Sequence, residues 1–363
     1  MKGQWIGLYT GDVEGKLMVN IDESDEFFDV VAYIIPFDIK IPASIAYLSV
    51  EKEHSGKETT AYIYPVDPIT ETQCKWDDIK HLYGEDISHS SRAEVTIIVI
   101  DGKLQINAIT DIGVALTSIL VRPEETDESR ISGRKMLWKN FKEYISEIPK
   151  SKYLFRGQKK TWPLRTSFHR RGRYRIDKLV DKDVVQLHKR LSAITNHYFD
   201  LARPEQYGSF LNLLQHHGYP TPLLDWSYSP YVAAFFAFRD WPIKYSDDEL
   251  VRIYFFNNKE WQDKYRQSLN INPPYPHLSV LEFIAIDNPR LVPQQAVTTL
   301  TNIVDIEAYV LDKGAKFLQA IDIPASEREE AMTELRFMGI TAGSMFPSID
   351  GVCEEIRERN FQK

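Results

Sequence analysis

Arg156 lies near the end of a short apolar run, YLFRGQ (residues 153–158), and Gly157 follows it directly. The run predicts a buried strand, and the glycine lets the backbone turn sharply or approach a ligand closely. A guanidinium group has a planar fork of N–H donors that matches a phosphate or a carboxylate. We therefore expect Arg156, Gly157 and Gln158 to contact an anionic ligand. The alternative is a structural ion pair between Arg156 and a carboxylate.

The segment QHHGYPTPLLDWSYSPYVAAFFAF (residues 215–238) predicts a strand, a loop and a buried helix in succession. The Ser-Pro pair after the loop is typical of a helix N-cap and the first helical position. Such a helix start carries free backbone N–H groups and a partial positive charge, which would face Asp225, Trp226 and Ser227. This arrangement suits an anion such as a pyrophosphate. The alternative gives the three residues structural roles only.

Two further groups of polar side chains are candidates for the same site. His216 and His217 are adjacent, so on a helix their side chains point about 100° apart, and we name His217 as the candidate base. The segment NPRLVPQQAVTTL (residues 288–300) follows a predicted strand and contains Gln294 and Gln295. A glutamine amide cannot act as a base, but it can orient a ribose hydroxyl or a base edge.

The strongest basic cluster in the chain is RTSFHRRGRYR (residues 165–175), which has five arginines interleaved with aromatic residues. Such a cluster could bind nucleic acid or a nucleotide phosphate, or it could be a solvated surface. The candidate nucleic-acid contacts are Arg165, Arg170, Arg171 and Arg173.

The length of 363 residues predicts two or three domains. The 44 basic and 52 acidic residues give a net charge of −8, which argues against wholesale binding to a nucleic-acid backbone. Charge is uneven, because residues 1–130 contain 11 basic and 24 acidic residues and the remainder contains 33 basic and 28 acidic residues. The change coincides with RPEETDESR (residues 122–130), which has the composition of an interdomain linker.

Residues 1–125 contain several short segments rich in β-branched and aromatic residues, separated by Gly, Asp, Asn or Pro. This pattern predicts an all-β sandwich or barrel, with a tight hairpin turn at Asp101-Gly102. From residue 132 the apolar period changes to that of helices, first at residues 136–148 and later at residues 183–196 and 205–217. We therefore predict an α+β domain over residues 132–363.

Cys74 and Cys353 are far apart and have no histidine at ligand spacing, so the sequence predicts neither a disulfide framework nor a metal site. The longest apolar stretches are far shorter than the roughly 18 residues that a membrane helix needs. The N-terminal residues lack the apolar run of a secretory signal. We therefore expect a cytoplasmic protein with no membrane partner.

Taken together, FRGQ, HHGYPTPLLDWSYSPYVAAFFAF, PRLVPQQ and MGITAGSMFPSIDG resemble the FRG domain family of bacterial and phage proteins, over roughly residues 132–360. Family members usually read PTRLLDWT. Here Pro222 replaces that arginine and Ser227 replaces the threonine, so a role of that arginine side chain does not carry over.

The family layout is similar to that of ADP-ribosyltransferases. The resemblance implies that Arg156 anchors the phosphates of NAD, that Asp225, Trp226 and Ser227 occupy the end of a second strand, and that Gln295 supplies a third strand's polar residue. The catalytic Glu-x-Glu of many such enzymes is missing, so catalysis would rest on Gln295, a histidine or Glu282, or be absent.

The resemblance favours an effector in toxicity or anti-phage defence that uses NAD as substrate, either transferring ADP-ribose to a protein or nucleic-acid acceptor or hydrolysing NAD. The catalytic candidates are Arg156, His217, Asp225, Ser227 and Gln295. The β-rich domain would be a sensor or would bind a regulatory partner. The alternatives are a non-catalytic module that binds a nucleotide or nucleic acid, and an interaction scaffold.

Overall fold

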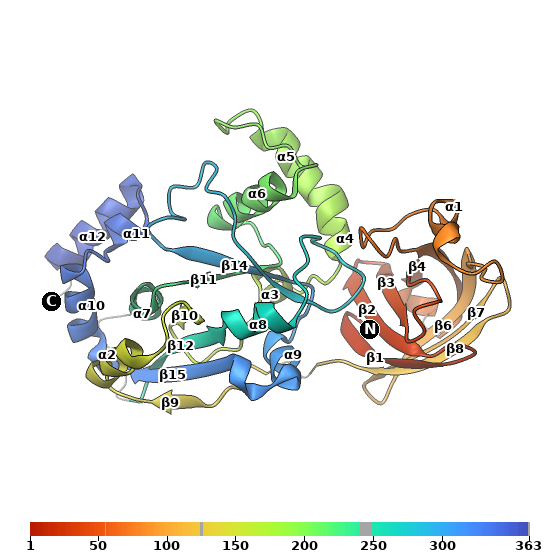
Figure 1. Cartoon of the computed structure of the whole chain (residues 1–363), viewed down its shortest axis with the longest axis horizontal. Coiled ribbons are helices and arrows are strands. Elements are labelled where there is room, and N and C mark those ends of the chain that lie inside the picture. Colours follow the sequence, from red (N-terminus) through yellow and green to blue (C-terminus); the bar gives the residue numbers. More distant parts are fainter. Residues whose placement is uncertain (55, 124–125, 240–247, 362–363) are drawn as a thin grey trace.

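The computed structural model describes residues 1–54, 56–123, 126–239 and 248–361. They form two domains, an N-terminal β-barrel and a second domain in which helices surround a mixed sheet (Figure 1). Within these ranges no helix has the length and apolar character needed to cross a membrane.

The N-terminal domain is a closed barrel, which decides between the two predicted β architectures. Each strand pairs antiparallel with the next along the chain, and the last strand pairs with the first. The strands are β1 (Gly3–Gly11), β2 (Gly15–Glu23), β3 (Phe27–Pro36), β4 (Ser44–Glu51), β5 (Glu58–Pro65), β6 (Arg92–Ile100), β7 (Lys103–Thr110) and β8 (Ala115–Val121).

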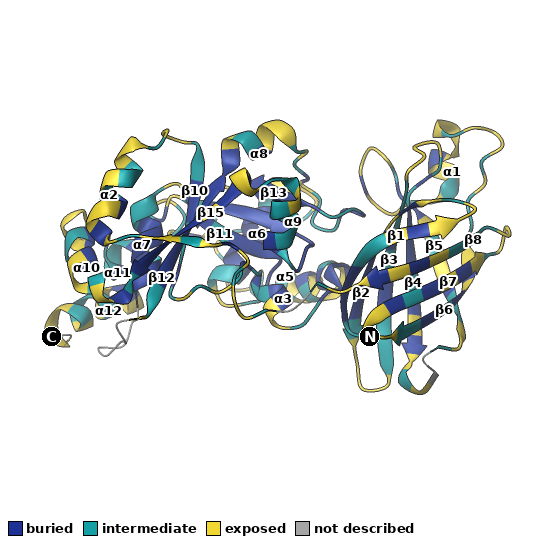
Figure 2. Ribbon diagram, turned by 90° about the horizontal axis from the view of Figure 1, so that it is seen from below, coloured by how far each residue is buried: buried dark blue, intermediate teal, exposed yellow. Residues whose placement is uncertain are grey.

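Alternation of apolar and polar residues directs side chains to the two faces of the barrel wall. In β7, Leu104, Ile106 and Ala108 are buried inside, whereas the residues between them are more exposed (Figure 2). The predicted hairpin turn is confirmed, because Ile100 pairs with Lys103 and both Asp101 and Gly102 have positive φ angles. Between the strands lie the short helices η1 (Lys52–His54), α1 (Trp76–Ile79) and η2 (Lys80–Leu82).

The second domain contains, in its described part, a seven-stranded sheet in the order β13-β14-β11-β10-β12-β15-β9. Only the β9–β15 pair is parallel. The strands are β9 (Gly133–Lys135), β10 (Tyr153–Gln158), β11 (Leu223–Ser227), β12 (Leu250–Asn257), β13 (Leu278–Leu281), β14 (Ala296–Thr301) and β15 (Leu318–Pro324).

Helices lie on both sides of this sheet (Figure 1). They are α2 (Trp138–Glu147), α3 (Ser167–Arg170), α4 (Ile176–Lys178), the π-helical η3 (Leu179–Val184), α5 (Val185–Leu191), α6 (Pro204–His216), α7 (Pro230–Phe238), α8 (Asn258–Lys264), α9 (Ile306–Lys313), η4 (Ala315–Phe317), η5 (Ala325–Glu327), α10 (Arg328–Phe337), α11 (Ala342–Met345) and α12 (Ile349–Phe361). The helix predicted at residues 183–196 ends at Leu191. The hydroxyls of Ser192 and Thr195 bond back to the carbonyls of His188 and Leu191 there, which competes with helix continuation.

Helix α7 is apolar around its whole circumference and lies in the core between the sheet and α10. It packs directly against β10 at Gly157. A Cβ atom at Gly157 would lie 1.8 Å from the carbonyl oxygen of Ala233, so only glycine permits this approach. The glycine after Arg156 therefore sets the distance between the strand and the helix.

The sheet divides between β10 and β11. Strand β10 pairs with β12 from Tyr153 to Gln158, but it pairs with β11 only where Phe155 meets Ser227. Strand β11 in turn pairs with β14 along its length. The two neighbouring strands therefore diverge beyond a single bridge, and backbone groups at their ends are left available to other partners.

The barrel packs on the second domain through polar and apolar contacts. Asp22 on β2 accepts a hydrogen bond from the backbone N–H of Tyr174 at 2.6 Å. Gln4 on β1 donates to the carbonyl of Asn302 at 2.6 Å. Around them Met18, Val31, Tyr33 and Ile45 of the barrel form an apolar cluster with Ile303. The two domains thus share a buried interface.

The predicted linker is anchored at its C-terminal end. Ser129 and the backbone N–H of Arg130 both donate to the carboxylate of Glu307 in the second domain. Glu124 and Glu125 of the same segment lie outside the described residues.

Candidate functional site

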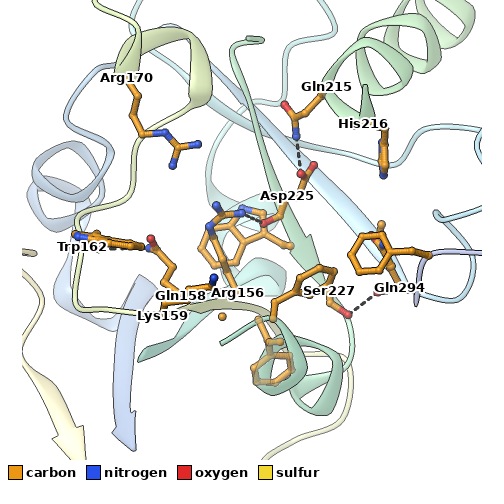
Figure 3. Close-up of a pocket in the computed structure, with 17 residues that line it drawn as sticks. Arg156, Gln158, Lys159, Trp162, Arg170, Gln215, His216, Asp225, Ser227 and Gln294 are labelled. Atoms are coloured by element: carbon orange, nitrogen blue, oxygen red, sulfur yellow. Dashed lines mark hydrogen bonds between the residues drawn. The ribbon is translucent and has the colours of Figure 1, made fainter. Parts of the chain in front are cut away.

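A pocket of about 420 Å³ lies where β10 and β11 diverge (Figure 3). Its volume is within the range of small-molecule sites, roughly 300–1,000 Å³. The residues that line it come from β10, α3, α6, β11, α7, β14 and three connecting segments: Phe155, Arg156, Gly157, Gln158, Lys159, Trp162, Arg170, Gln215, His216, Asp225, Trp226, Ser227, Ala233, Phe236, Gln294, Ala296 and Phe346.

Arg156 lies at the centre of this pocket (Figure 3). Its Nη1 donates to the backbone carbonyl of Asp225 at 2.6 Å, which the divergence of the two strands leaves available. Its Nε is buried and has no hydrogen-bond partner among the described residues. Burial lowers the pKa of Arg156 to about 10, against the opposing effect of Asp225, so the group is charged at neutral pH. A buried cation with an unused N–H donor can bind an anion.

Asp225 is the one carboxylate among the described lining residues. Its Oδ2 accepts a hydrogen bond from Gln215 Nε2 at 2.5 Å. Gln215 is itself oriented, because its Oε1 accepts a hydrogen bond from the hydroxyl of Thr221. Helix α6 therefore supplies the group that sets the direction of the carboxylate on β11.

Ser227 and Gln294 form the opposite wall through contacts within the protein. Ser227 Oγ donates to the carbonyl of Gln294 at 2.8 Å and accepts from the N–H of Ser229 at 3.0 Å. The amide of Gln294 donates to the carbonyl of Met345 at 2.8 Å. These side chains hold the loop before β14 against β11 and shape the pocket.

Two further cationic side chains and an exposed aromatic ring line the mouth of the pocket. Arg170 and Lys159 line it beside the indole of Trp162, which is 47% exposed. Partial burial and the neighbouring Arg171 lower the pKa of Arg170. The backbone of Trp162 is held by Tyr254, whose hydroxyl donates to its carbonyl at 2.7 Å. The mouth thus offers cationic groups next to a planar ring.

The structure brings together most of the residues that the sequence singled out, but it separates two of them. His217 lines a different surface groove, whereas its neighbour His216 lines the pocket. Gln295 is exposed at a positive φ angle, and Gln294 lines the pocket instead. In both cases the predicted residue and the residue that lines the pocket are neighbours in the chain. A shift of one position is enough to turn a side chain to another face of a helix or loop.

Several lining residues were not predicted as parts of this site. Lys159 and Trp162 were given no role, and Phe346 lies in the segment MGITAGSMFPSIDG, which was used only for the family resemblance. The proximity of Gln215 to Asp225 depends on how α6 packs beside β11. Arg170 was predicted within the arginine cluster, as a contact for nucleic acid or a nucleotide phosphate, and not as part of the pocket of Arg156. Among the described residues, no group of three or more His, Cys, Asp or Glu side chains could hold a metal ion.

The arginine cluster divides among different environments. Arg173 is paired with Asp183 and lies 3.9 Å from Asp22 of the barrel, and Arg175 is buried beside Asp177. Arg170 and Arg171 are exposed and Arg165 is half-buried. The cluster is therefore partly an interdomain contact and partly the rim of the pocket.

Comparison with protein families identifies this region. The family model of the FRG domain matches residues 151–244, which include β10, β11 and α7. The expected presence of an FRG domain is confirmed over this range, which is narrower than the predicted extent. No curated protein and no solved structure was found to match the chain.

Proposed function

Taking residues 151–244 as an FRG domain, we propose that the pocket binds NAD and cleaves its nicotinamide glycosidic bond. The domain would transfer the ADP-ribose to a macromolecule or to water. The observation that carries this proposal is the half-buried guanidinium of Arg156, whose Nε has no partner among the described residues, within a pocket lined by aromatic rings.

The cationic groups suit the pyrophosphate of NAD. Arg156 and Arg170 reach the pocket from separate segments, so together they can contact two phosphates of one ligand. Trp162 at the mouth offers a flat apolar surface on which a nicotinamide or adenine ring can stack. Charge and stacking together would hold a dinucleotide in one orientation.

Cleavage requires little chemistry beyond positioning and charge stabilisation. The bond between the ribose C1′ and the nicotinamide nitrogen breaks, and its electron pair goes to the ring, which neutralises the ring's positive charge. The ribose acquires oxocarbenium character, and the acceptor oxygen or nitrogen then bonds to C1′ and releases a proton. Asp225, oriented by Gln215, would stabilise the positive ribose and accept this proton.

The other candidates have supporting roles in this proposal. Ser227 and Gln294 use their polar groups to hold the pocket wall, so they would position the ligand rather than react with it. His216 replaces His217 as the histidine beside the ligand. Gln295 and Glu282 are exposed and do not line the pocket.

We further propose that the protein is an effector in toxicity or anti-phage defence, with the barrel as its sensor or partner-binding domain. Asp22 of the barrel holds the backbone of Tyr174 in the same arginine-rich segment that supplies Arg170 to the pocket. A partner that moved the barrel would therefore act on the pocket rim. The exposed Arg171 is the candidate contact for a nucleic-acid acceptor.

Calorimetric titration with NAD tests the site. We expect wild type to bind NAD and Arg156→Ala to lose binding ~10- to 100-fold, because charged hydrogen bonds are lost. Arg134→Ala, an exposed arginine of β9, is the matched control and should bind as wild type does. Thermal melts confirm that each variant is folded. Equal affinity of all three proteins, or no binding by wild type, would contradict the proposed site.

Nicotinamide release from labelled NAD tests the reaction separately. Release with labelled ADP-ribose on protein, RNA or DNA would identify a transferase, and release without labelled acceptor would identify a glycohydrolase. Binding that is lost in Arg156→Ala without any release would instead favour the non-catalytic nucleotide-binding module.

A further inference from the structure

A second cavity, of about 460 Å³, lies between the barrel and the FRG domain, and we call it the interdomain cavity. Thr70 and Thr72 of the loop between β5 and β6 line it from the barrel side. The second domain lines it with η3, α6, residues 269–272 and the strands β11, β13 and β14. Its apolar lining residues include Leu201, Leu211, Leu269, Ile271, Leu281 and Phe283.

The lining has no formal charge. Apolar side chains predominate, and the polar groups within the described residues are the uncharged Thr70, Thr72, Tyr207, Asn270 and Asn272. Charged residues make up 26% of the chain, so a lining without any of them differs from the average composition of the protein. A charged ligand would lose its hydration here without gaining a counterion, so the lining selects against ions.

Tyr207 on α6 provides a polar group without a partner. Its hydroxyl is buried and makes no hydrogen bond with any described residue. Burial, with a contribution from the charge of Asp181, raises the pKa of Tyr207, so the hydroxyl keeps its proton. Buried hydroxyls normally find a hydrogen-bond partner. The Tyr207 hydroxyl has almost no accessible surface, so a ligand with an acceptor atom would supply this partner once the ring turned its hydroxyl into the cavity.

The barrel side of the cavity is held in place by Glu71, which lies between the two lining threonines. Glu71 is buried, has a φ of +59°, and pairs with Arg266 at 2.5 Å. Its Oε2 accepts from Ser268 at 3.0 Å and its carbonyl accepts from Asn270 at 2.7 Å. These bonds tie the barrel loop to the segment that forms the opposite wall, so the cavity depends on the contact between the domains.

Helix α6 connects this cavity with the NAD pocket. Tyr207, Gly208 and Leu211 line the interdomain cavity, while Gln215 and His216, one to two turns further on, line the pocket. A molecule in the cavity would therefore contact the helix that orients Asp225.

We propose that the interdomain cavity binds a small, uncharged, mainly apolar molecule with one hydrogen-bond acceptor for Tyr207. Such a molecule would contact both domains at once and stabilise their present arrangement. The cavity is thereby a binding site that is separate from the pocket of Arg156. The proposal concerns binding and stands whether or not the FRG domain cleaves NAD.

The uncharged dye prodan, whose ketone oxygen accepts hydrogen bonds, is the probe. We expect saturable binding to the full chain, seen as a rise and blue shift of its emission. Tyr207→Phe should weaken binding about five- to tenfold, since it removes one hydrogen bond and keeps the ring. Thr72→Trp places a large ring at the cavity wall and should abolish binding. Thr10→Trp, the same change at an exposed position on β1, should have no effect.

Two further variants locate the dye. Arg156→Ala changes only the NAD pocket, and Ala108→Val fills space inside the barrel, so both should bind prodan as wild type does. Thermal melts without dye establish that all variants are folded, and prodan should raise the melting temperature of wild type but not of Thr72→Trp. No saturable binding by wild type, equal binding by Thr72→Trp, or loss of binding in Arg156→Ala or Ala108→Val would overturn the proposal.

Discussion

The pocket that we propose binds NAD and the interdomain cavity are similar in volume and share helix α6, but their linings differ in charge. The pocket contains two arginines, a lysine and a carboxylate, whereas the cavity lining has only uncharged side chains within the described residues. Judged by volume alone, the pocket and the cavity would accept ligands of the same size. Lining charge separates them, because a dinucleotide needs counterions and an uncharged molecule does not.

The largest expected effect concerns the carboxylate of the pocket. Asp225→Asn keeps the shape of the side chain and removes its negative charge, so we expect nicotinamide release to fall by ~100-fold or more. Prodan binding should be unchanged, since Asp225 does not line the interdomain cavity. Steady-state release assays and dye titration measure the two effects. Retained release in Asp225→Asn would remove this residue from the proposed mechanism.

The response to pH should also separate the two sites. Burial lowers the pKa of Arg156 to about 10, so the cation proposed to bind NAD is present below this pH and is lost as the pH rises above it. We expect NAD affinity to be constant between pH 7 and 9 and to decrease as the pH rises through 10. Calorimetry across this range, with circular dichroism to verify folding, tests the expectation. An affinity that did not change up to pH 11 would exclude the guanidinium as the titrating anchor.

A change in the interdomain contact should affect the cavity alone. Glu71→Gln removes the charge that pairs with Arg266, which loosens the loop bearing Thr70 and Thr72, so prodan affinity should fall roughly three- to fivefold. NAD affinity should not change. Glu85→Gln, an exposed glutamate in the same β5–β6 connection, is the matched control. If both variants bound prodan equally well, Glu71 would not support the cavity wall.

The smallest expected effect is that of salt. Raising NaCl from 50 to 500 mM should weaken NAD binding roughly two- to fourfold, because Arg170 and Lys159 lie at the open mouth of the pocket, where ions screen them. Prodan binding should stay constant or strengthen slightly, as expected for apolar burial. Parallel titrations in both buffers provide the test. A decrease of prodan affinity with salt would indicate a charged contribution that the cavity lining does not show.

Much of the candidate site was predictable from local sequence. The apolar run before Arg156, the glycine after it and the Ser-Pro helix start each describe a few consecutive residues, and the structure has the expected strand, close approach and capped helix. The hairpin at Asp101-Gly102 was predictable for the same reason. In these cases backbone conformation follows from residue types that are neighbours in the chain.

The sequence by itself thus indicated the β-rich first domain, the helices α2, α5, α6 and α7, and the two motifs that carry Arg156 and Asp225. Only the tertiary structure decided that the β domain closes as a barrel, that His216 and Gln294 rather than His217 and Gln295 line the pocket, and that Arg173 faces the barrel. It alone also formed the interdomain cavity, from segments more than 100 residues apart. The physical reason is that local patterns set backbone conformation, whereas packing between distant segments sets which face each side chain occupies.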